Sequence, residues 1–183
     1  MIKIELLEVA GLASVMQALR LPFGKDARSY VESKATYNLA RKEFTTGTKV
    51  VPHDNDMSLL ETLVKNGDEH AKVLRGMVVY LAITAPRFWW MEMDTYKIGT
   101  ERLSSESTMH IQGKGLSTEE LVKMKSELTE GTLQKRVQMF SYQTLRRIYF
   151  QRRNHRLPMW HDFCAFIEIL PFAKELILCQ REK

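Results

Sequence analysis

The segment of residues 132–153 constrains the fold of this chain more than any other part of the sequence. It contains neither glycine nor proline, so it predicts one long helix. Its apolar residues are spread around the helix instead of forming a single stripe; they are Leu133, Val137, Phe140, Leu145, Ile148, Tyr149 and Phe150. A helix that is apolar on all sides needs contacts on several sides. The segment therefore predicts a central helix, and in a chain of only 183 residues it favours a self-associating subunit.

Further strands and helices are expected on both sides of this segment. Clustered apolar and β-branched residues predict strands over residues 1–9 and 73–84. Helices are predicted over residues 11–19, 26–41, 57–65, 86–93, 118–128 and 158–178, with Pro171 as a candidate interruption of the last. Residues 45–54 and 99–115 are expected to be irregular. The pattern predicts an α+β chain.

Local signals mark the ends of several predicted helices. Asp56 is a good N-cap residue for the helix over 57–65, and Gly67 is a stop signal after it. Pro86 suits the first position of the next helix. Ser117 and Glu120 have the spacing of a capping box, in which each side chain bonds the other residue's backbone N–H.

Composition narrows the class of protein. Hydrophobic residues make up 44% and charged residues 27%, which is typical of a soluble globular domain, expected here to be a single one over residues 1–183. No stretch approaches the roughly 20 apolar residues that span a bilayer, and the N-terminus lacks the pattern of a signal peptide. Cys164 and Cys179 indicate neither a disulfide framework nor metal-ligand spacing, so we expect a cytoplasmic protein without a metal site.

Positive charge is concentrated near the C-terminus. Residues 131–160 contain no Asp or Glu and seven basic residues: Lys135, Arg136, Arg146, Arg147, Arg152, Arg153 and Arg156. The remainder of the chain holds 20 basic residues against 22 acidic ones, so it is close to neutral. A basic cluster of this kind suits a nucleotide, a dinucleotide cofactor or a polynucleotide. The alternative is a solvated basic face.

Three short groups of residues occur in an informative order. They are Ala85-Pro86-Arg87-Phe88, then Glu92-Met93-Asp94-Thr95-Tyr96-Lys97-Ile98-Gly99-Thr100, then Ser104-Ser105-Glu106-Ser107. This set resembles the flavin-dependent thymidylate synthases, in which A-P-x-F at a helix start precedes Q-x-x-R-H-R-x-x-S-x-N-E-x-S-x-R-Y. Asn66-Gly67-Asp68-Glu69-His70 is similar to the family's H-G-H-E-like turn, and Pro158-Met159-Trp160-His161 to its A-Q-W-E segment. The resemblance extends over about residues 56–170.

The chain departs from the family pattern at its centre. The R-H-R triplet is replaced by Thr95-Tyr96-Lys97, and the glutamine before it by Glu92. The first serine corresponds to Thr100, the second to Ser105 and the following arginine to Ser107, although a two-residue insertion would align Glu106-Ser107 instead. A lysine can hold a phosphate as a point charge, but it lacks the planar pair of donors of an arginine.

The resemblance implies a small antiparallel sheet packed with helices around a long central helix. It also implies FAD as cofactor, with Lys97, Thr100 and Arg147 as contacts. NADPH and methylenetetrahydrofolate would be co-substrates, and the subunits would form a homotetramer. For a pyrimidine nucleotide such as dUMP, the implied contacts are Glu92, Ser105, Ser107, Lys125 and Arg152. Among these Arg152 is the candidate catalytic residue, since a guanidinium can stabilise charge on the uracil ring.

Three functions stay open at this stage. The first is a divergent flavin-dependent enzyme, similar to virus-encoded members, which transfers a one-carbon unit to dUMP or a related pyrimidine nucleotide. The second is an inactive member of the fold that binds a nucleotide or a macromolecule through its basic helix. The third is nucleic-acid binding, because basic residues alternate with Tyr142, Tyr149, Phe150 and Trp160. Core packing explains those aromatic residues better than stacking on bases does.

Overall fold

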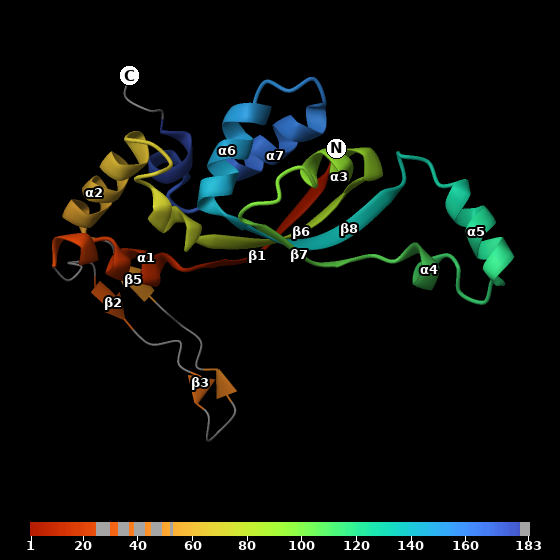
Figure 1. Cartoon of the computed structure of the whole chain (residues 1–183), viewed down its shortest axis with the longest axis horizontal. Helices are drawn as coiled ribbons and strands as arrows, with labels where there is room; N and C mark the ends of the chain where they lie inside the picture. The colour runs from red at the N-terminus through yellow and green to blue at the C-terminus, as the bar shows by residue number, and fades with distance from the viewer. Residues whose placement is uncertain (25–29, 33–36, 39–42, 45–48, 52, 180–183) are drawn as a thin grey trace.

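An antiparallel sheet of four strands forms the centre of the molecule (Figure 1). The computed structural model describes residues 1–24, 30–32, 37–38, 43–44, 49–51 and 53–179. The sheet has the order β1-β6-β8-β7, and its strands are β1 (Lys3–Ala10), β6 (Val78–Pro86), β8 (Leu133–Ser141) and β7 (Thr100–Ser105). Two further antiparallel pairs are β2 (Tyr30–Glu32) with β5 (Lys49–Val51), and β3 (Tyr37–Asn38) with β4 (Glu43–Phe44).

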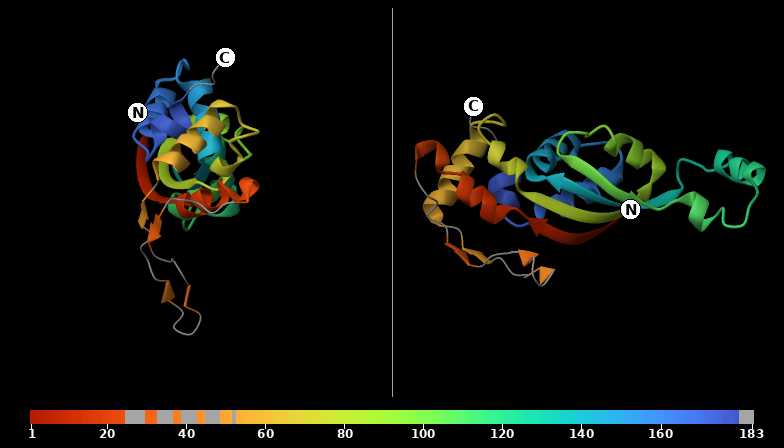
Figure 2. Two further views of the ribbon diagram at one scale, coloured as in Figure 1. Left: turned by 90° about the vertical axis from the view of Figure 1, so that its left-hand side faces the viewer. Right: turned by 60° about the horizontal axis from the view of Figure 1, so that its bottom comes forward.

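Helices pack against one face of the sheet. Figure 1 shows α3 (Arg87–Met93), α6 (Tyr142–Arg152) and α7 (Pro158–Glu168) together on that face. The remaining elements are α1 (Leu12–Ala18), α2 (Asp54–Lys65), the 3₁₀ turns Leu21–Phe23 and Lys72–Arg75, and the π-helical turn Lys174–Leu178. Between β7 and β8 the chain leaves the body as an arm that carries α4 (Thr108–Ile111) and α5 (Thr118–Ser126), as the right-hand view of Figure 2 shows. None of the helices that the structure describes is long and apolar enough to cross a membrane.

The core lies between the sheet and these helices. Val79, Leu81 and Ile83 project from alternate positions of β6 into it. Trp89 on α3 packs at 4.9 Å between ring centroids against Trp160 on α7, and Phe163 on α7 lies 5.7 Å from the Trp89 ring. Such aromatic contacts add to the stabilisation that burial of the rings already provides. Helices α3 and α7 are therefore anchored to each other by large buried rings.

The single helix predicted over residues 132–153 is wrong. The segment forms strand β8 followed by helix α6, with the change at Ser141, whose Oγ accepts a hydrogen bond from Thr144 N at 3.2 Å. β8 pairs with β6 on one side and with β7 on the other. Its side chains alternate between two faces, as a strand requires. Apolar residues lie on both faces of this strand. When the same residues are placed on a helix, they are spread around all of its sides, which is why the sequence favoured a helix.

Three other expectations need correction. The helix over 26–41 is wrong, since the described residues in that range form strands β2 and β3; the others lie outside the described residues. The segments 45–54 and 99–115, which were expected to be irregular, contain β5, β7 and α4. Asp56 does not cap a helix: α2 begins at Asp54, with His53 Nδ1 accepting from Asn55 N, and Asp56 is buried within it as the ion-pair partner of Arg20.

Several elements agree with the sequence. β1 and α1 lie where the N-terminal strand and helix were expected, and α3 follows Pro86. The capping box of Ser117 and Glu120 is present at the start of α5. In the C-terminal region α7 ends at Glu168, three residues before Pro171, and a π-helical turn follows. The α+β class with a small antiparallel sheet is confirmed.

Candidate functional site

A tight turn between α3 and β7 builds the candidate site. Gly99 adopts a left-handed conformation with φ of 74°, which favours glycine. A Cβ at this position would lie 2.3 Å from Thr144 Oγ1 and 2.5 Å from Ser141 Oγ. The Gly99 carbonyl accepts from Ser141 N at 2.7 Å, and Thr144 Oγ1 donates to the Ile98 carbonyl at 2.7 Å. The turn is thereby fixed against the N-terminus of α6.

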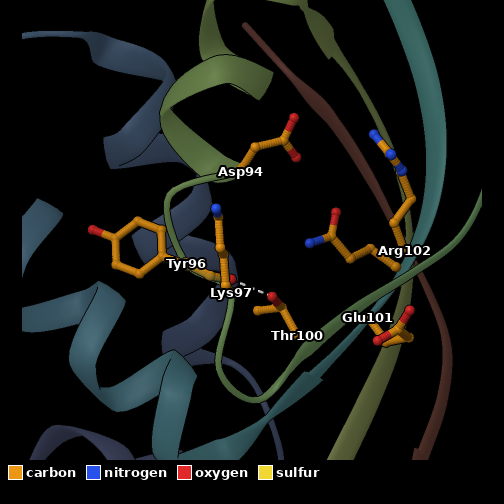
Figure 3. A pocket seen from close by; sticks show the side chains of 7 residues that line it. Asp94, Tyr96, Lys97, Thr100, Glu101 and Arg102 are labelled. Atoms are coloured by element: carbon orange, nitrogen blue, oxygen red, sulfur yellow. Dashed lines mark hydrogen bonds between the residues drawn. The ribbon is translucent and has the colours of Figure 1, made fainter.

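A polar pocket of about 360 Å³ lies beside this turn. Its lining comes from the turn and from two strands: Asp94, Tyr96, Lys97, Thr100, Glu101, Arg102 and Gln138. Figure 3 shows the side chains of Lys97 and Arg102 on opposite sides of the pocket, with Asp94 at the top of the pocket in this view. The pocket therefore presents two cations toward a shared space.

The carboxylate of Asp94 at the pocket wall is compensated by a buried arginine. Arg136 Nη1 donates to Asp94 Oδ1 at 2.8 Å and to Oδ2 at 3.0 Å. The same guanidinium lies 4.4 Å from the centroid of the Trp90 ring and bonds Gln134 Oε1 at 3.0 Å. Lys97 and Arg102 form no ion pair with any carboxylate of the described residues. With Asp94 neutralised, only Glu101 opposes these two cations, so the pocket suits an anionic group.

Gln138 is the most enclosed residue of the pocket lining. Its exposed fraction is 3%, and its Oε1 has no hydrogen-bond partner among the described residues. On β8 it pairs with Leu81 of β6 on one side and with Arg102 of β7 on the other. It thus lies where the apolar core ends and the polar pocket begins. A buried carbonyl without a partner is costly in a folded protein.

A second polar cluster surrounds Arg152 at the C-terminal end of α6. Arg152 Nη1 donates to Glu92 Oε2 at 2.8 Å, and Arg152 Nε donates to Tyr96 Oη at 2.7 Å. The guanidinium lies 4.5 Å from the centroid of the Trp160 ring, whose Nε1 also donates to Glu92 Oε2 at 2.8 Å. His155 Nε2 lies 3.6 Å from the same oxygen. Glu92 and Arg152 are therefore occupied with each other and with aromatic residues.

Tyr96 separates the pocket from this cluster. Tyr96 is one of the residues that line the pocket, yet its ring points away from Lys97 in Figure 3. Its hydroxyl accepts a hydrogen bond from Arg152. Only 5% of Tyr96 is exposed. Arg147 lies on the exposed side of α6 with its guanidinium 5.7 Å from the Tyr96 ring centroid. Arg152 is not among the residues that line the pocket.

The residues predicted from the sequence fall into three places. Lys97 and Thr100 line the pocket, where Thr100 Oγ1 donates to the Tyr96 carbonyl. Glu92, Arg147 and Arg152 lie around the ring of Tyr96, on the other side of it. The remaining three are on the arm or at its base: Ser105 ends β7, Ser107 precedes α4, and Lys125 lies on α5. Figure 1 shows α5 far from α6, so this chain alone does not bring Lys125 to Arg152.

Sequence reasoning did not identify Asp94, Glu101, Arg102 and Gln138 as members of the site. Gln138 could not be assigned to the site while its segment was predicted to be a helix. As strand β8 the segment pairs with β7, and the register of that pairing sets Gln138 beside Arg102. The only alternation of apolar and polar residues in β8 is Val137-Gln138-Met139, a weak signal that the absence of glycine and proline outweighed.

The basic residues of the C-terminal region serve different purposes. Arg136 and Arg146 are buried, and Arg146 donates to the carbonyls of Ile177 and Cys179. Tyr142 and Trp160 are fully buried, so they offer no surface on which a base could stack. Within the described residues no group of three or more His, Cys, Asp or Glu side chains is arranged to hold a metal ion.

Similarity to known proteins is visible in the structure alone. The sequence matches no protein-family model and no curated protein. The flavin-dependent thymidylate synthase ThyX from Helicobacter pylori, solved in complex with FAD and dUMP, superposes with a TM-score of 0.67 at 12% identity over 98% of this chain and 100% of that chain. A second structure of ThyX from the same organism, also with FAD and dUMP, gives a TM-score of 0.65 at 13% identity over 97% of each chain. The chain therefore has the fold of the flavin-dependent thymidylate synthases.

Proposed function

We propose that this protein is a divergent flavin-dependent thymidylate synthase-like enzyme, which binds dUMP or a related pyrimidine nucleotide and transfers a one-carbon unit to it. The observation that carries the proposal is the pocket between Lys97 and Arg102, on the turn that follows α3. The two ThyX structures that share this fold were solved with FAD and dUMP bound. Both ligands are phosphate esters, and the pocket offers two cations without a carboxylate partner among the described residues.

The residues of the pocket fit the phosphate-bearing part of such a ligand. Lys97 and Arg102 supply charge, and Thr100 lies between them in the sequence with its hydroxyl already bonded to the Tyr96 carbonyl. Pockets for drug-sized ligands span about 300–1,000 Å³. A volume of about 360 Å³ therefore suits one nucleotide, but not both nucleotides of an FAD molecule. We infer that the rest of FAD would lie on a neighbouring subunit of a homotetramer.

When bound, FAD would supply the redox chemistry, with NADPH as reductant and methylenetetrahydrofolate as one-carbon donor. The residues of this chain would bind and orient the nucleotide. Arg147, exposed beside the Tyr96 ring, is available to a phosphate. Arg152 can contribute to catalysis only if Glu92 releases it, because an ion-paired guanidinium has less charge to offer a developing anion.

A second candidate function rests on that same ion pair. Arg152 is bonded to Glu92 and Tyr96 and stacked on Trp160, and its side chain is 17% exposed. If this arrangement persists with ligand bound, the chain binds a nucleotide without turning it over. The protein would then be a nucleotide sensor, or would serve a macromolecular partner.

Binding and turnover measurements on the full chain separate these possibilities. Titration calorimetry with dUMP and with FAD is the first measurement, on the wild type and on the variants Lys97→Ala and Arg102→Ala. Lys123→Ala, on the exposed side of α5 in the arm, is the matched control. Loss of one phosphate contact to a cation is expected to weaken binding about tenfold or more, whereas the control keeps wild-type affinity.

Formation of dTMP from dUMP in the presence of FAD, NADPH and methylenetetrahydrofolate is the second measurement. Turnover by the wild type supports the enzyme. Binding of dUMP without turnover supports the second candidate. A wild type that binds neither dUMP nor FAD rules out the enzyme and the nucleotide sensor.

A further inference from the structure

The buried carboxamide of Gln138 has a hydrogen-bonding capacity that the folded chain does not use. Gln138 is 97% buried by residue area, since only 3% is exposed, and its Oε1 has no partner in the described part of the chain. Only one other buried side-chain atom of the described residues shares this condition, Trp89 Nε1, and Trp89 lies in the core away from the pocket lining. Gln138 differs because it lines the pocket.

An unpaired buried carbonyl on a residue that lines a pocket has a physical consequence. Removing a polar group from water without providing a partner costs about 1–3 kcal/mol. A ligand that supplies an N–H donor at this position recovers that cost, and a ligand without the donor does not. Sites built around buried polar groups discriminate strongly for this reason. The neighbours of Gln138 on the sheet are Leu81, which belongs to the core, and Arg102, which belongs to the pocket.

We propose that Gln138 binds the imide edge of a uracil-type ring, which is held in the pocket by its negatively charged part at Lys97 and Arg102. In an imide an N–H lies between two carbonyl groups. A carboxamide matches this edge with two hydrogen bonds: Oε1 accepts from the N–H and Nε2 donates to a carbonyl. Uracil nucleotides and the flavin ring both carry this edge. This assignment rests on the proposed function, and it adds the group that selects the ring.

Replacing Gln138 is expected to have different effects on the free protein and on the complex. The variant Gln138→Leu removes the unpaired carbonyl while it keeps the approximate length of the side chain. In the free protein it is expected to leave the melting temperature unchanged or to raise it, because no hydrogen bond is lost. In the complex it removes both bonds to the imide, and binding is expected to weaken about tenfold or more.

Titration calorimetry with dUMP, FMN and N3-methyl-dUMP tests the assignment. Wild-type protein is expected to bind dUMP or FMN, the preferred one identifying the source of the imide, and to bind N3-methyl-dUMP about tenfold more weakly than dUMP if dUMP is preferred. Gln138→Leu is expected to bind the preferred ligand more weakly by a similar factor. Its affinities for dUMP and N3-methyl-dUMP are expected to be equal. Gln143→Leu is the control: Gln143 bonds Arg75 and the Asp68 carbonyl outside the pocket, so its loss lowers stability without changing affinity.

Three results would overturn the assignment. If Gln138→Leu keeps wild-type affinity for dUMP and FMN, Gln138 does not contact the ring, while the proposed function stands. If the free variant melts well below the wild type, the carboxamide is already satisfied in the folded protein, and the premise is wrong. If the wild type binds no imide ligand at all, the assignment and the proposed function fail together.

Discussion

Arg152 Nε donates to Tyr96 Oη at 2.7 Å, and this bond joins the end of α6 to the turn that follows α3. The two residues are 56 positions apart in the sequence. Tyr96 occupies the middle of the segment that resembles the family's R-H-R triplet, and Arg152 is the arginine that the resemblance assigns to the substrate. In this chain the residue that replaces the histidine therefore holds the candidate catalytic arginine in place.

Tyr96→Phe removes this bond and leaves the ring. A hydrogen bond to a charged group contributes about 1.5–3 kcal/mol, so the variant is expected to lose about that much free energy of unfolding. Urea denaturation followed by tryptophan fluorescence measures the loss. Tyr149→Phe is the matched control, because its hydroxyl donates to Glu168 on an exposed part of α7 and is expected to contribute less than about 1 kcal/mol. Equal losses in the two variants would contradict a special role for the Tyr96–Arg152 bond.

Glu92→Gln tests whether the ion pair restrains Arg152. An amide oxygen can still accept from Arg152 and from Trp160 Nε1, but the negative charge is gone. The variant is expected to lose about 1–3 kcal/mol of stability, since a partly buried charge pair becomes a single charge. It is also expected to bind dUMP more tightly than the wild type, because a neutral amide holds the Arg152 guanidinium less strongly than a carboxylate does and leaves more of its charge for an anion.

Calorimetry with dUMP gives the affinity, with Glu119→Gln on the exposed first turn of α5 as the control. That control also removes one negative charge, but it does so on the arm, so its affinity should equal that of the wild type. If Glu92→Gln and Glu119→Gln bind dUMP with the same affinity, the ion pair does not limit binding. Glu92 then has only a structural role.

Gly99 and Gly115, two of the glycines with positive φ, give a matched pair of alanine variants. Both positions are left-handed, so alanine costs about 1–2 kcal/mol at either. At Gly115 nothing lies within 4 Å of the added Cβ, whereas at Gly99 it meets Thr144 Oγ1 and Ser141 Oγ at less than 3 Å. Crowding adds about 1–3 kcal/mol. Gly99→Ala is therefore expected to be the less stable variant in denaturant titration, and equal stabilities would show that the turn tolerates displacement.

The same pair reports on the pocket. Gly99 lies between Lys97 and Thr100, so moving its turn displaces both residues from their positions in the lining. Affinity for dUMP is expected to fall in Gly99→Ala and to stay unchanged in Gly115→Ala. A normal affinity in a destabilised Gly99→Ala would mean that the ligand does not use this turn.

Local signals in the sequence were sufficient for much of the fold. The capping box of Ser117 and Glu120 and the proline before α3 act over a few residues, so their effects could be predicted without knowledge of the rest of the chain. β8 could not be predicted in this way. Its conformation depends on pairing with β6 and β7, and tertiary pairing overrides the preference of a segment that lacks glycine and proline.

The site followed the same division. Lys97 and Thr100 line the pocket, and they could be singled out because they lie in one continuous stretch that resembles a family motif; their role as cofactor contacts stays a prediction. Gln138 could not be singled out, because its place in the pocket comes from its register against Arg102. The ion pair of Glu92 with Arg152 could not be predicted from the sequence either. It depends on how α3 and α6 pack, and on Glu92 also accepting the hydrogen bond from the buried Trp160 Nε1.

Cys164 gives a prediction about pH that is independent of any ligand. The thiol is buried on α7, and burial, with a contribution from Glu168, raises its pKa to about 11 from a reference of 9.0. Because the thiolate is the reactive form, about 0.1% of the thiol is reactive at pH 8, against about 10% for the reference group. In a Cys179→Ala variant, alkylation of Cys164 is therefore expected to be about a hundredfold slower in the native protein than in urea.

The raised pKa also fixes the sign of a stability change. The folded state holds the Cys164 proton more tightly than the unfolded state, so its contribution is fully present below pH 9 and is lost as pH rises toward 11. The difference in free energy of unfolding between the wild type and Cys164→Ala should therefore shrink across this window. Tyr142, whose pKa burial also raises, titrates in both proteins and cancels from the difference. A difference that stays constant from pH 8 to pH 11 would show that the thiol ionises as readily in the folded chain as in the unfolded one.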